Sequence, residues 1–259
     1  MNKKREFQIK ENLKKGQMTL FVIIGIVIVV AAVLIYLFFP QIKSSLGFGS
    51  ENPDAFMKNC LEKELNSKIE LITSQGGSLN PEHYYMFKGE KIEYLCYTAE
   101  DYATCVMQQP MLKQHIEEEV KQAISSEVGT CLNELRSSFS SKGYDVKSSG
   151  NNYFVEIFPK KIAVTFNTSL VLIGDNTKAY NNINIILDNN LFELISIANS
   201  IQNWEARYGD AETTIYMNYY HDTKVEKQVQ IDGTTIYTLT NRETGEQLKF
   251  ASRSGVIPA

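Results

Sequence analysis

The residues with the most specific chemistry in this 259-residue chain are its four cysteines, all between positions 60 and 131. Cys96 and Cys105 flank a short segment and could bond locally, whereas Cys60 and Cys131 lie on the apolar faces of two expected helices. In an oxidising compartment, an even number of cysteines predicts disulfides, here Cys60–Cys131 and Cys96–Cys105. Buried free thiols remain an alternative. A zinc site is disfavoured, because zinc sites usually contain closely spaced pairs such as C-x2-C.

The chain carries no familiar catalytic or nucleotide-binding motif. We find no G-x-S-x-G, H-E-x-x-H, P-loop or G-x-G-x-x-G pattern. The three histidines, His83, His115 and His221, are far apart in the sequence. His115 is soon followed by glutamates that would fan around a helix, which is typical of a solvated face rather than a metal site. We therefore expect no metal, no cofactor and no catalytic activity.

Aromatic residues gather in the last quarter of the chain, where Trp204, Tyr216, Tyr219 and Tyr220 lie close together in sequence. Trp and Tyr are enriched in protein interfaces, so these four residues are predicted to form a contact surface. Core packing against the carboxyl-terminal strands is the alternative for the same residues.

One modification signal is present. Asn167-Thr168-Ser169 matches the acceptor triplet for N-glycosylation, which makes Asn167 a candidate site if this part of the chain lies outside the cell. The triplet falls within a predicted strand, where the acceptor could be inaccessible.

Ahead of all these residues lies a long apolar run, LFVIIGIVIVVAAVLIYLFF, at positions 20–39. No charged residue occurs from Gly16 to Ile42. About 20 apolar residues at about 1.5 Å each span about 30 Å, the thickness of a bilayer core. We predict one transmembrane helix within residues 17–42, with the lipid bilayer as its partner.

Charge sets the expected orientation of this helix. Residues 1–16 hold six basic and two acidic residues, so they carry +4 of a total of −4 and leave −8 on the rest of the chain. Basic flanks stay in the cytoplasm, which predicts a cytoplasmic tail at 1–16 and an extracellular location for everything after the helix. The acidic outer part also argues against nucleic acid as a partner.

The Lys-Lys-Gly-Gln stretch at 14–17, directly before the apolar run, resembles the class III signal of archaeal type IV pilins and archaellins. The resemblance implies that a prepilin-peptidase-like enzyme cuts between Gly16 and Gln17. It also implies other pilin-like subunits or surface proteins as partners. Phe21 departs from the Glu that bacterial-type pilins carry at the fifth mature position, and Pro40 would interrupt the helix. An uncleaved signal anchor is the alternative.

Two further stretches extend the resemblance. The Asn-Cys-Leu at 59–61, in a helix ending in Gln-Gly-Gly at 75–77, and the Lys-Phe-Ala-Ser-Arg at 249–253 are similar to uncharacterised pilin-signal surface proteins of small-genome archaea. This similarity implies a location and an anchor, not an activity.

Beyond the membrane helix, residues 43–52 are predicted to be a Gly/Ser-rich linker and residues 53–259 an extracytoplasmic domain. Asn52 is an expected N-cap, with Pro53 in the first turn of a helix whose apolar spacing continues to Ile72.

Later segments alternate between helical and strand patterns. A second long helix is predicted from Leu112 to Phe139, and a third, capped by Asp188, over 191–208, with a short helix within 210–221. Strands are predicted at 84–87, 92–97, 153–157, 162–172, 183–187, 225–231, 235–240 and 247–252. This order predicts an α+β fold with three to four helices and a largely antiparallel sheet, since no regular βαβ alternation occurs.

Together these features predict a membrane-anchored cell-surface protein with a structural or adhesive role, or a minor pilin-like subunit. The alternatives are a membrane-anchored extracytoplasmic enzyme that acts on envelope polymers, and a ligand-binding ectodomain. An enzyme would require a pocket in which titratable side chains converge.

Overall fold

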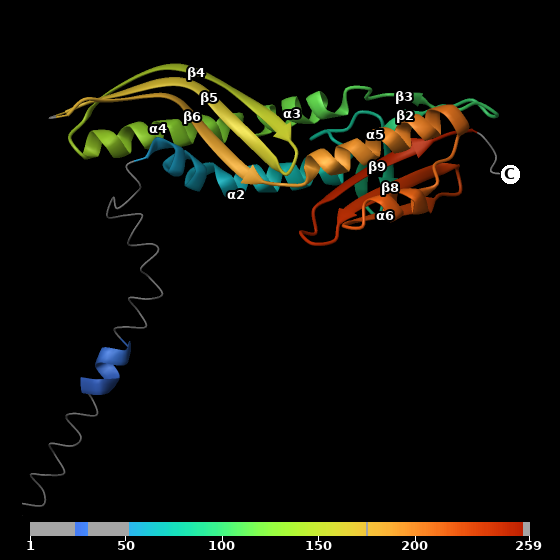
Figure 1. The fold of residues 1–259 in the computed structure, drawn as a ribbon, viewed down its shortest axis with the longest axis horizontal. Coiled ribbons are helices and arrows are strands. Elements are labelled where there is room, and N and C mark those ends of the chain that lie inside the picture. Colours follow the sequence, from blue (N-terminus) through green and yellow to red (C-terminus); the bar gives the residue numbers. More distant parts are fainter. Residues whose placement is uncertain (1–23, 31–51, 175, 256–259) are drawn as a thin grey trace, which may run out of the picture. The chain divides into compact units, whose positions relative to one another are not determined.

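The computed structural model describes residues 24–30, 52–174 and 176–255. The chain divides into two compact units, Met1–Glu51 and Asn52–Ala259, and each is treated by itself (Figure 1).

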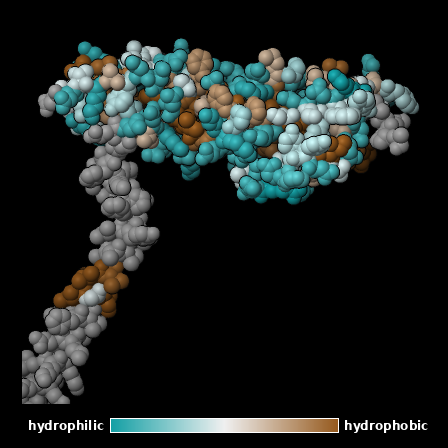
Figure 2. All heavy atoms as spheres, viewed as in Figure 1, coloured by the Kyte–Doolittle hydropathy of each residue, from teal (hydrophilic) through white to brown (hydrophobic). Residues whose placement is uncertain are grey.

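In the first unit, residues 24–30 form a helical segment. Its six apolar side chains are each 46–62% exposed, and the segment is hydrophobic apart from its glycine (Figure 2). The predicted processing site at Gly16 and Gln17, the rest of the predicted membrane helix and the linker up to residue 51 lie outside the described residues. Within the described part of the chain, no helix is long and apolar enough to cross a membrane.

The second unit begins with helix α2, Pro53–Ser74, at the predicted position. The Asn52 side chain accepts a hydrogen bond from the backbone nitrogen of Asp54 at 3.0 Å, which confirms the predicted N-cap. Buried residues at helical spacing give the helix one apolar face. Gly76 and Gly77 follow the helix with φ angles of 97° and 112°, a region that favours glycine.

The single helix predicted from Leu112 to Phe139 is wrong, because the structure has two helices there. They are α3, Leu112–Ala123, and α4, Ser125–Ser141. Ile124 separates them with φ −101° and ψ 4°, which are not α-helical angles. Buried apolar residues continue across the break, so the periodicity alone does not reveal it.

Three long strands form an antiparallel meander in the order β4-β5-β6. Alternate side chains of β5 are buried, as the period of two predicts. A bulge in β4 places Gly150 at φ 82°, and the Thr168 hydroxyl donates to the Gly150 carbonyl at 3.0 Å. The bounds are β4 Asp145–Phe158, β5 Lys161–Ile173 and β6 Lys178–Asp188.

Carboxylates from the helices reach both edge strands of this meander. Glu117 of α3 accepts a hydrogen bond from the backbone nitrogen of Ile157 in β4 at 2.7 Å. Asp54 of α2 accepts one from the backbone nitrogen of Asn184 in β6 at 2.9 Å. Each carboxylate occupies a donor that would otherwise be open to another strand.

The other sheet has six strands, three from the first part of the second unit and three from its last part. Its order is β1-β2-β9-β8-β7, with the short β3 also paired to β2. Neighbours are antiparallel except for β2 and β9, which run parallel and place Tyr94 beside Ala251. The bounds are β1 Tyr84–Phe87, β2 Glu90–Tyr97, β3 Val106–Met107, β7 Thr223–Val229, β8 Thr234–Asn241 and β9 Gln247–Arg253.

Helix α5, Leu191–Tyr208, follows the meander and ends at Gly209, which adopts a left-handed φ of 78°. The prediction that Asp188 caps this helix is wrong, because Asp188 is the last residue of β6. The Asn189 side chain instead accepts a hydrogen bond from the backbone nitrogen of Leu191 at 2.9 Å. A short helix, α6 Thr213–Tyr219, confirms the predicted helix before β7.

The two sheets share one hydrophobic core. Helices α2, α3 and α4 contact the meander, whereas α5 lies against the six-stranded sheet (Figure 1). A continuous cluster of buried residues extends from α2 through the meander to β8 and β9. The predicted α+β fold with largely antiparallel sheets is therefore confirmed.

Candidate functional site

The four cysteines are paired as predicted. Cys60 of α2 is bonded to Cys131 of α4, with their Cα atoms 6.0 Å apart and a sequence separation of 71 residues. Cys96 of β2 is bonded to Cys105, with a Cα separation of 5.3 Å and nine residues along the chain. The first bond joins two helices beneath the meander, and the second closes the loop between β2 and β3.

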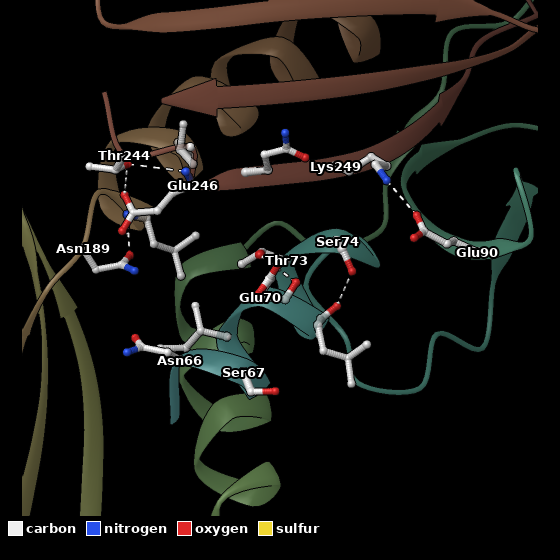
Figure 3. Close-up of a pocket in the computed structure, with 16 residues that line it drawn as sticks. Asn66, Ser67, Glu70, Thr73, Ser74, Glu90, Asn189, Thr244, Glu246 and Lys249 are labelled. Carbon is white, nitrogen blue, oxygen red and sulfur yellow. Dashed lines mark hydrogen bonds and ion pairs between the residues drawn. The ribbon is translucent and has the colours of Figure 1, made fainter. Parts of the chain in front are cut away.

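A groove of about 760 Å³ lies between helix α2 and the β8–β9 turn of the second unit. One side is the exposed face of α2 from Asn66 to Ser74, and the other is the β8–β9 turn with the start of β9 (Figure 3). The buried side chains of Leu191 and Leu194 from α5 contribute to its lining. Because four separate segments build this groove, including Glu90 of β2, no local sequence motif predicts it.

Some polar groups of the groove already have partners. The Glu246 carboxylate accepts hydrogen bonds from the backbone and side-chain nitrogens of Asn190 at 2.9 and 2.7 Å, and from the Thr244 hydroxyl at 2.8 Å. At the other end, the ammonium of Lys249 lies 2.7 Å from the Glu90 carboxylate (Figure 3). These contacts fix the two ends of the groove.

A second cluster of polar residues lies between α2, β2 and α3. The Ser78 hydroxyl donates to Glu93 Oε2 at 2.5 Å, and the Ser78 oxygen also lies 2.7 Å from His115 Nε2. Because the hydroxyl has only one proton, His115 Nε2 must donate to Ser78 in this arrangement. Glu119 of α3 accepts a hydrogen bond from the backbone nitrogen of Leu79 at 2.7 Å. The prediction of a merely solvated face around His115 is therefore wrong.

The two glycines after α2 allow this cluster to form. A Cβ atom at Gly76 would lie 2.6 Å from the Cβ of Glu93, so only glycine permits the turn to approach β2 this closely. Burial raises the pKa of the Glu93 carboxyl, while its hydrogen bond with Ser78 and the nearby charge of His115 act in the opposite direction. The cluster is thus a chain of hydrogen bonds that links β2, the turn after α2 and α3.

The arrangement differs from a hydrolytic triad. In a triad the histidine lies between the serine and the carboxylate, whereas here Ser78 lies between Glu93 and His115. Ser78 is only 6% exposed. The contacts suit a structural junction better than a nucleophile that must reach a substrate.

A third polar cluster is fully buried beneath α5. Glu205 accepts hydrogen bonds from the hydroxyls of Tyr237 and Ser252. Burial raises the pKa of Glu205, and burial beside Glu205 also raises the pKa of Tyr237. One turn earlier on α5, Gln202 is completely buried, and neither atom of its amide has a hydrogen-bond partner in the described part of the structure. Neither Glu93 nor Glu205 lines the groove.

The predicted aromatic contact surface divides into two groups. Trp204, Tyr219 and Tyr220 are 46%, 81% and 46% exposed, and Trp204 packs against Tyr208 with ring centroids 4.8 Å apart. Tyr216 is buried in the core, and its hydroxyl is hydrogen-bonded to Ser200 at 3.0 Å, so its assignment to the surface is wrong. The period of the short helix places Tyr216 on its inner face.

Asn167 lies in β5 with an exposed side chain, opposite Asn152 in the bulged part of β4. The next residue, Thr168, is buried and its hydroxyl is held by the Gly150 carbonyl. The acceptor asparagine is therefore accessible, whereas the threonine beside it is fixed within the sheet.

Sequence reasoning did not find the Glu93–Ser78–His115 contact or the groove. The Gln-Gly-Gly stretch at 75–77 signalled the end of a helix, but nothing in it identifies Glu93 as the neighbour. Among the described residues, no group of three or more His, Cys, Asp or Glu side chains is placed to hold a metal ion.

Comparison with known proteins gives no further guide to the site. No family model, no curated protein sequence and no solved structure matches this chain.

Proposed function

We propose that this protein is a single-pass membrane protein that displays an acidic α+β domain on the outer surface of the cell. The role is structural or adhesive rather than catalytic. The observation that carries the proposal is the helical segment at 24–30, whose apolar side chains are exposed to 46–62%. A helix that is apolar on all sides is stable only when an apolar medium covers it, and the run at 20–39 has the length of a bilayer core.

The disulfides support the outer location of the second unit. All four cysteines in the chain are bonded in pairs, which suits an oxidising compartment and not the reducing cytoplasm. The basic tail at 1–16 supports the opposite location for the amino terminus.

The resemblance to class III signals supports a more specific proposal. A prepilin-peptidase-like enzyme removes residues 1–16, and the mature chain begins at Gln17. The mature protein is then either a tethered monomer or a subunit that associates with other pilin-like proteins.

Amino-terminal sequencing of the membrane-extracted protein tests both the membrane anchor and its proposed cleavage. A start at Gln17 supports processing, whereas an intact Met1 reduces the anchor to an uncleaved one. Maleimide labelling of intact cells before and after reduction tests the location. We expect label on cysteines only after reduction, and free thiols in protein from the soluble fraction would contradict the proposal.

A second candidate function is a membrane-anchored hydrolase, in which Ser78 would be the nucleophile and Glu93, which accepts the Ser78 hydrogen bond at 2.5 Å, its general base. Treatment with a fluorophosphonate probe tests it. In such a reaction the Ser78 oxygen bonds to phosphorus, fluoride leaves and the hydroxyl proton passes to Glu93, its acceptor in the structure. We expect no labelling; labelling of the native chain that disappears in Ser78→Ala would establish the hydrolase instead.

A further inference from the structure

The groove between α2 and the β8–β9 turn contains several polar side chains without a hydrogen-bond partner among the described residues. Within the described residues, the side chains of Asn66, Ser67, Glu70 and Gln247 have no hydrogen-bond partner, and all four residues are exposed along the groove. They come from two chain segments more than 170 positions apart, so the fold brings them to one cavity.

Asn189 adds a group of a different kind. It is only 8% exposed, and its side-chain oxygen is occupied by the backbone nitrogen of Leu191. Its amide nitrogen has no acceptor among the described residues and lies at the same end of the groove as Asn66 (Figure 3). Because this nitrogen lines the groove and is open to it, a ligand or water can accept a hydrogen bond there.

The charges of the groove exclude anionic ligands. Glu70, Glu90 and Glu246 all contribute to its lining, and the basic residue of the lining, Lys249, is already paired with Glu90. A phosphate or carboxylate would therefore meet carboxylates without a compensating cation.

The unused groups also distinguish between the remaining ligand classes. The amides of Asn66, Asn189 and Gln247 supply N–H donors, which a cation cannot satisfy because it has no acceptor. Glu70 supplies acceptors only. A hydroxyl group both donates and accepts, so a ligand rich in hydroxyls can satisfy amides and carboxylate together. The exposed aliphatic side chain of Leu71 offers contact to the C–H faces of the same ligand.

We propose that this groove binds a neutral saccharide, held by the side chains of Asn66, Glu70, Asn189 and Gln247. The volume of about 760 Å³ is in the range of small-molecule sites. This inference goes beyond the proposed surface location and does not depend on it, since the groove lies within the second unit.

The test is a binding titration on the full chain in a zwitterionic detergent without a sugar head group. The probes are maltotriose, cellotriose, mannotriose and chitotriose, with a lysine-rich peptide as the cationic competitor. We expect at least one trisaccharide to bind with a Kd of about 1 mM or tighter.

Variants then assign the binding to the groove. Asn66→Leu combined with Gln247→Leu should weaken trisaccharide binding by about tenfold or more, because ligand hydroxyls lose their partners. The matched control is Asn59→Leu combined with Gln228→Leu, since both are exposed residues outside the groove lining. Here we expect a change within about twofold, which is the effect of a distant surface substitution. Thermal unfolding of each variant confirms that the fold is retained.

Three outcomes would overturn the inference. The first is that none of the trisaccharides gives a saturating signal. The second is that both variant pairs bind equally well. The third is binding of the lysine-rich peptide alone, abolished by Glu70→Gln, which would assign the groove to a basic ligand. Because the measurement is made in solution, none of these results bears on where the protein is anchored.

Discussion

The two sheets of the second unit are built in different ways. The meander β4-β5-β6 takes its strands from one continuous stretch, residues 145–188, and joins them by short turns. The six-stranded sheet combines strands from residues 84–107 with strands from residues 223–253, and a parallel pair, β2 with β9, holds the two groups together. The first sheet needs mainly local contacts, whereas the second forms only when distant parts of the chain meet.

This difference has a counterpart in the disulfides. The bond beneath the meander spans 71 residues, and the bond in the six-stranded sheet spans nine. In the chain-entropy model, the longer loop restricts the unfolded chain more. The region with local strand pairing therefore has the more strongly stabilising covalent link.

The largest expected effect tests this contrast directly. Replacing Cys60 and Cys131 together by alanine should lower the free energy of unfolding by about 4 kcal/mol, because a 71-residue loop is released. Urea unfolding under non-reducing conditions measures the loss. A loss smaller than that of the other cysteine pair would break the comparison.

The same double replacement at Cys96 and Cys105 should cost less, about 2.6 kcal/mol, since the loop has only nine residues. The identical urea experiment serves, and the cysteine pair of the helices acts as the matched control. Equal losses for the two pairs would show that loop length does not set the stabilisation here.

A smaller effect is expected at the start of α2. Asn52→Ala removes the side-chain acceptor for the Asp54 nitrogen and should cost about 1 kcal/mol. Asn59→Ala, within the same helix and exposed, is the matched control and should have little effect. If both variants lose the same stability, the cap contributes nothing specific.

The smallest effect at neutral pH is expected for Glu205→Gln, below about 1 kcal/mol, because weaker hydrogen bonds are offset by removal of a buried charge. The pH dependence is the sharper measurement. Burial raises the pKa of Glu205, so the free energy of unfolding falls as pH rises from the ordinary carboxyl pKa to the folded value, and then stays level.

Glu205→Gln should flatten that decline. Unfolding measured from pH 4 to pH 8 tests the expectation, with Glu243→Gln as the control, since Glu243 is an exposed residue of the β8–β9 turn. An unchanged profile in Glu205→Gln would show that this buried carboxyl does not set the pH dependence of the six-stranded sheet.

The contrast between the sheets also explains what could be predicted from the sequence. The alternation in β5 and the capping signal at Asn52 are local, so both elements appear as expected. The break at Ile124 was missed because a buried residue there preserves the apolar pattern. The parallel pairing of β2 with β9 leaves no local mark, since the partners are about 155 positions apart.

The candidate sites were harder to predict than the fold for the same reason. Cys60 and Cys131 could be paired because each lay on an apolar helix face. Ser78, Glu93 and His115 come from a turn, a strand and a helix, and no spacing links them. The groove likewise combines α2 with a turn near the end of the chain.

The position of Cys60 has a mechanical consequence. A pulling force that enters the second unit at Asn52 reaches this covalent bond within the first turns of α2. Beyond that point the load passes through the sulfur atoms to Cys131, so the 71-residue stretch between them carries no tension. Unravelling from the amino-terminal side would then pass from Cys60 directly to Cys131, within α4, and would leave the residues between them unextended. A domain tethered at that end is thus protected against shear where the strain is first applied.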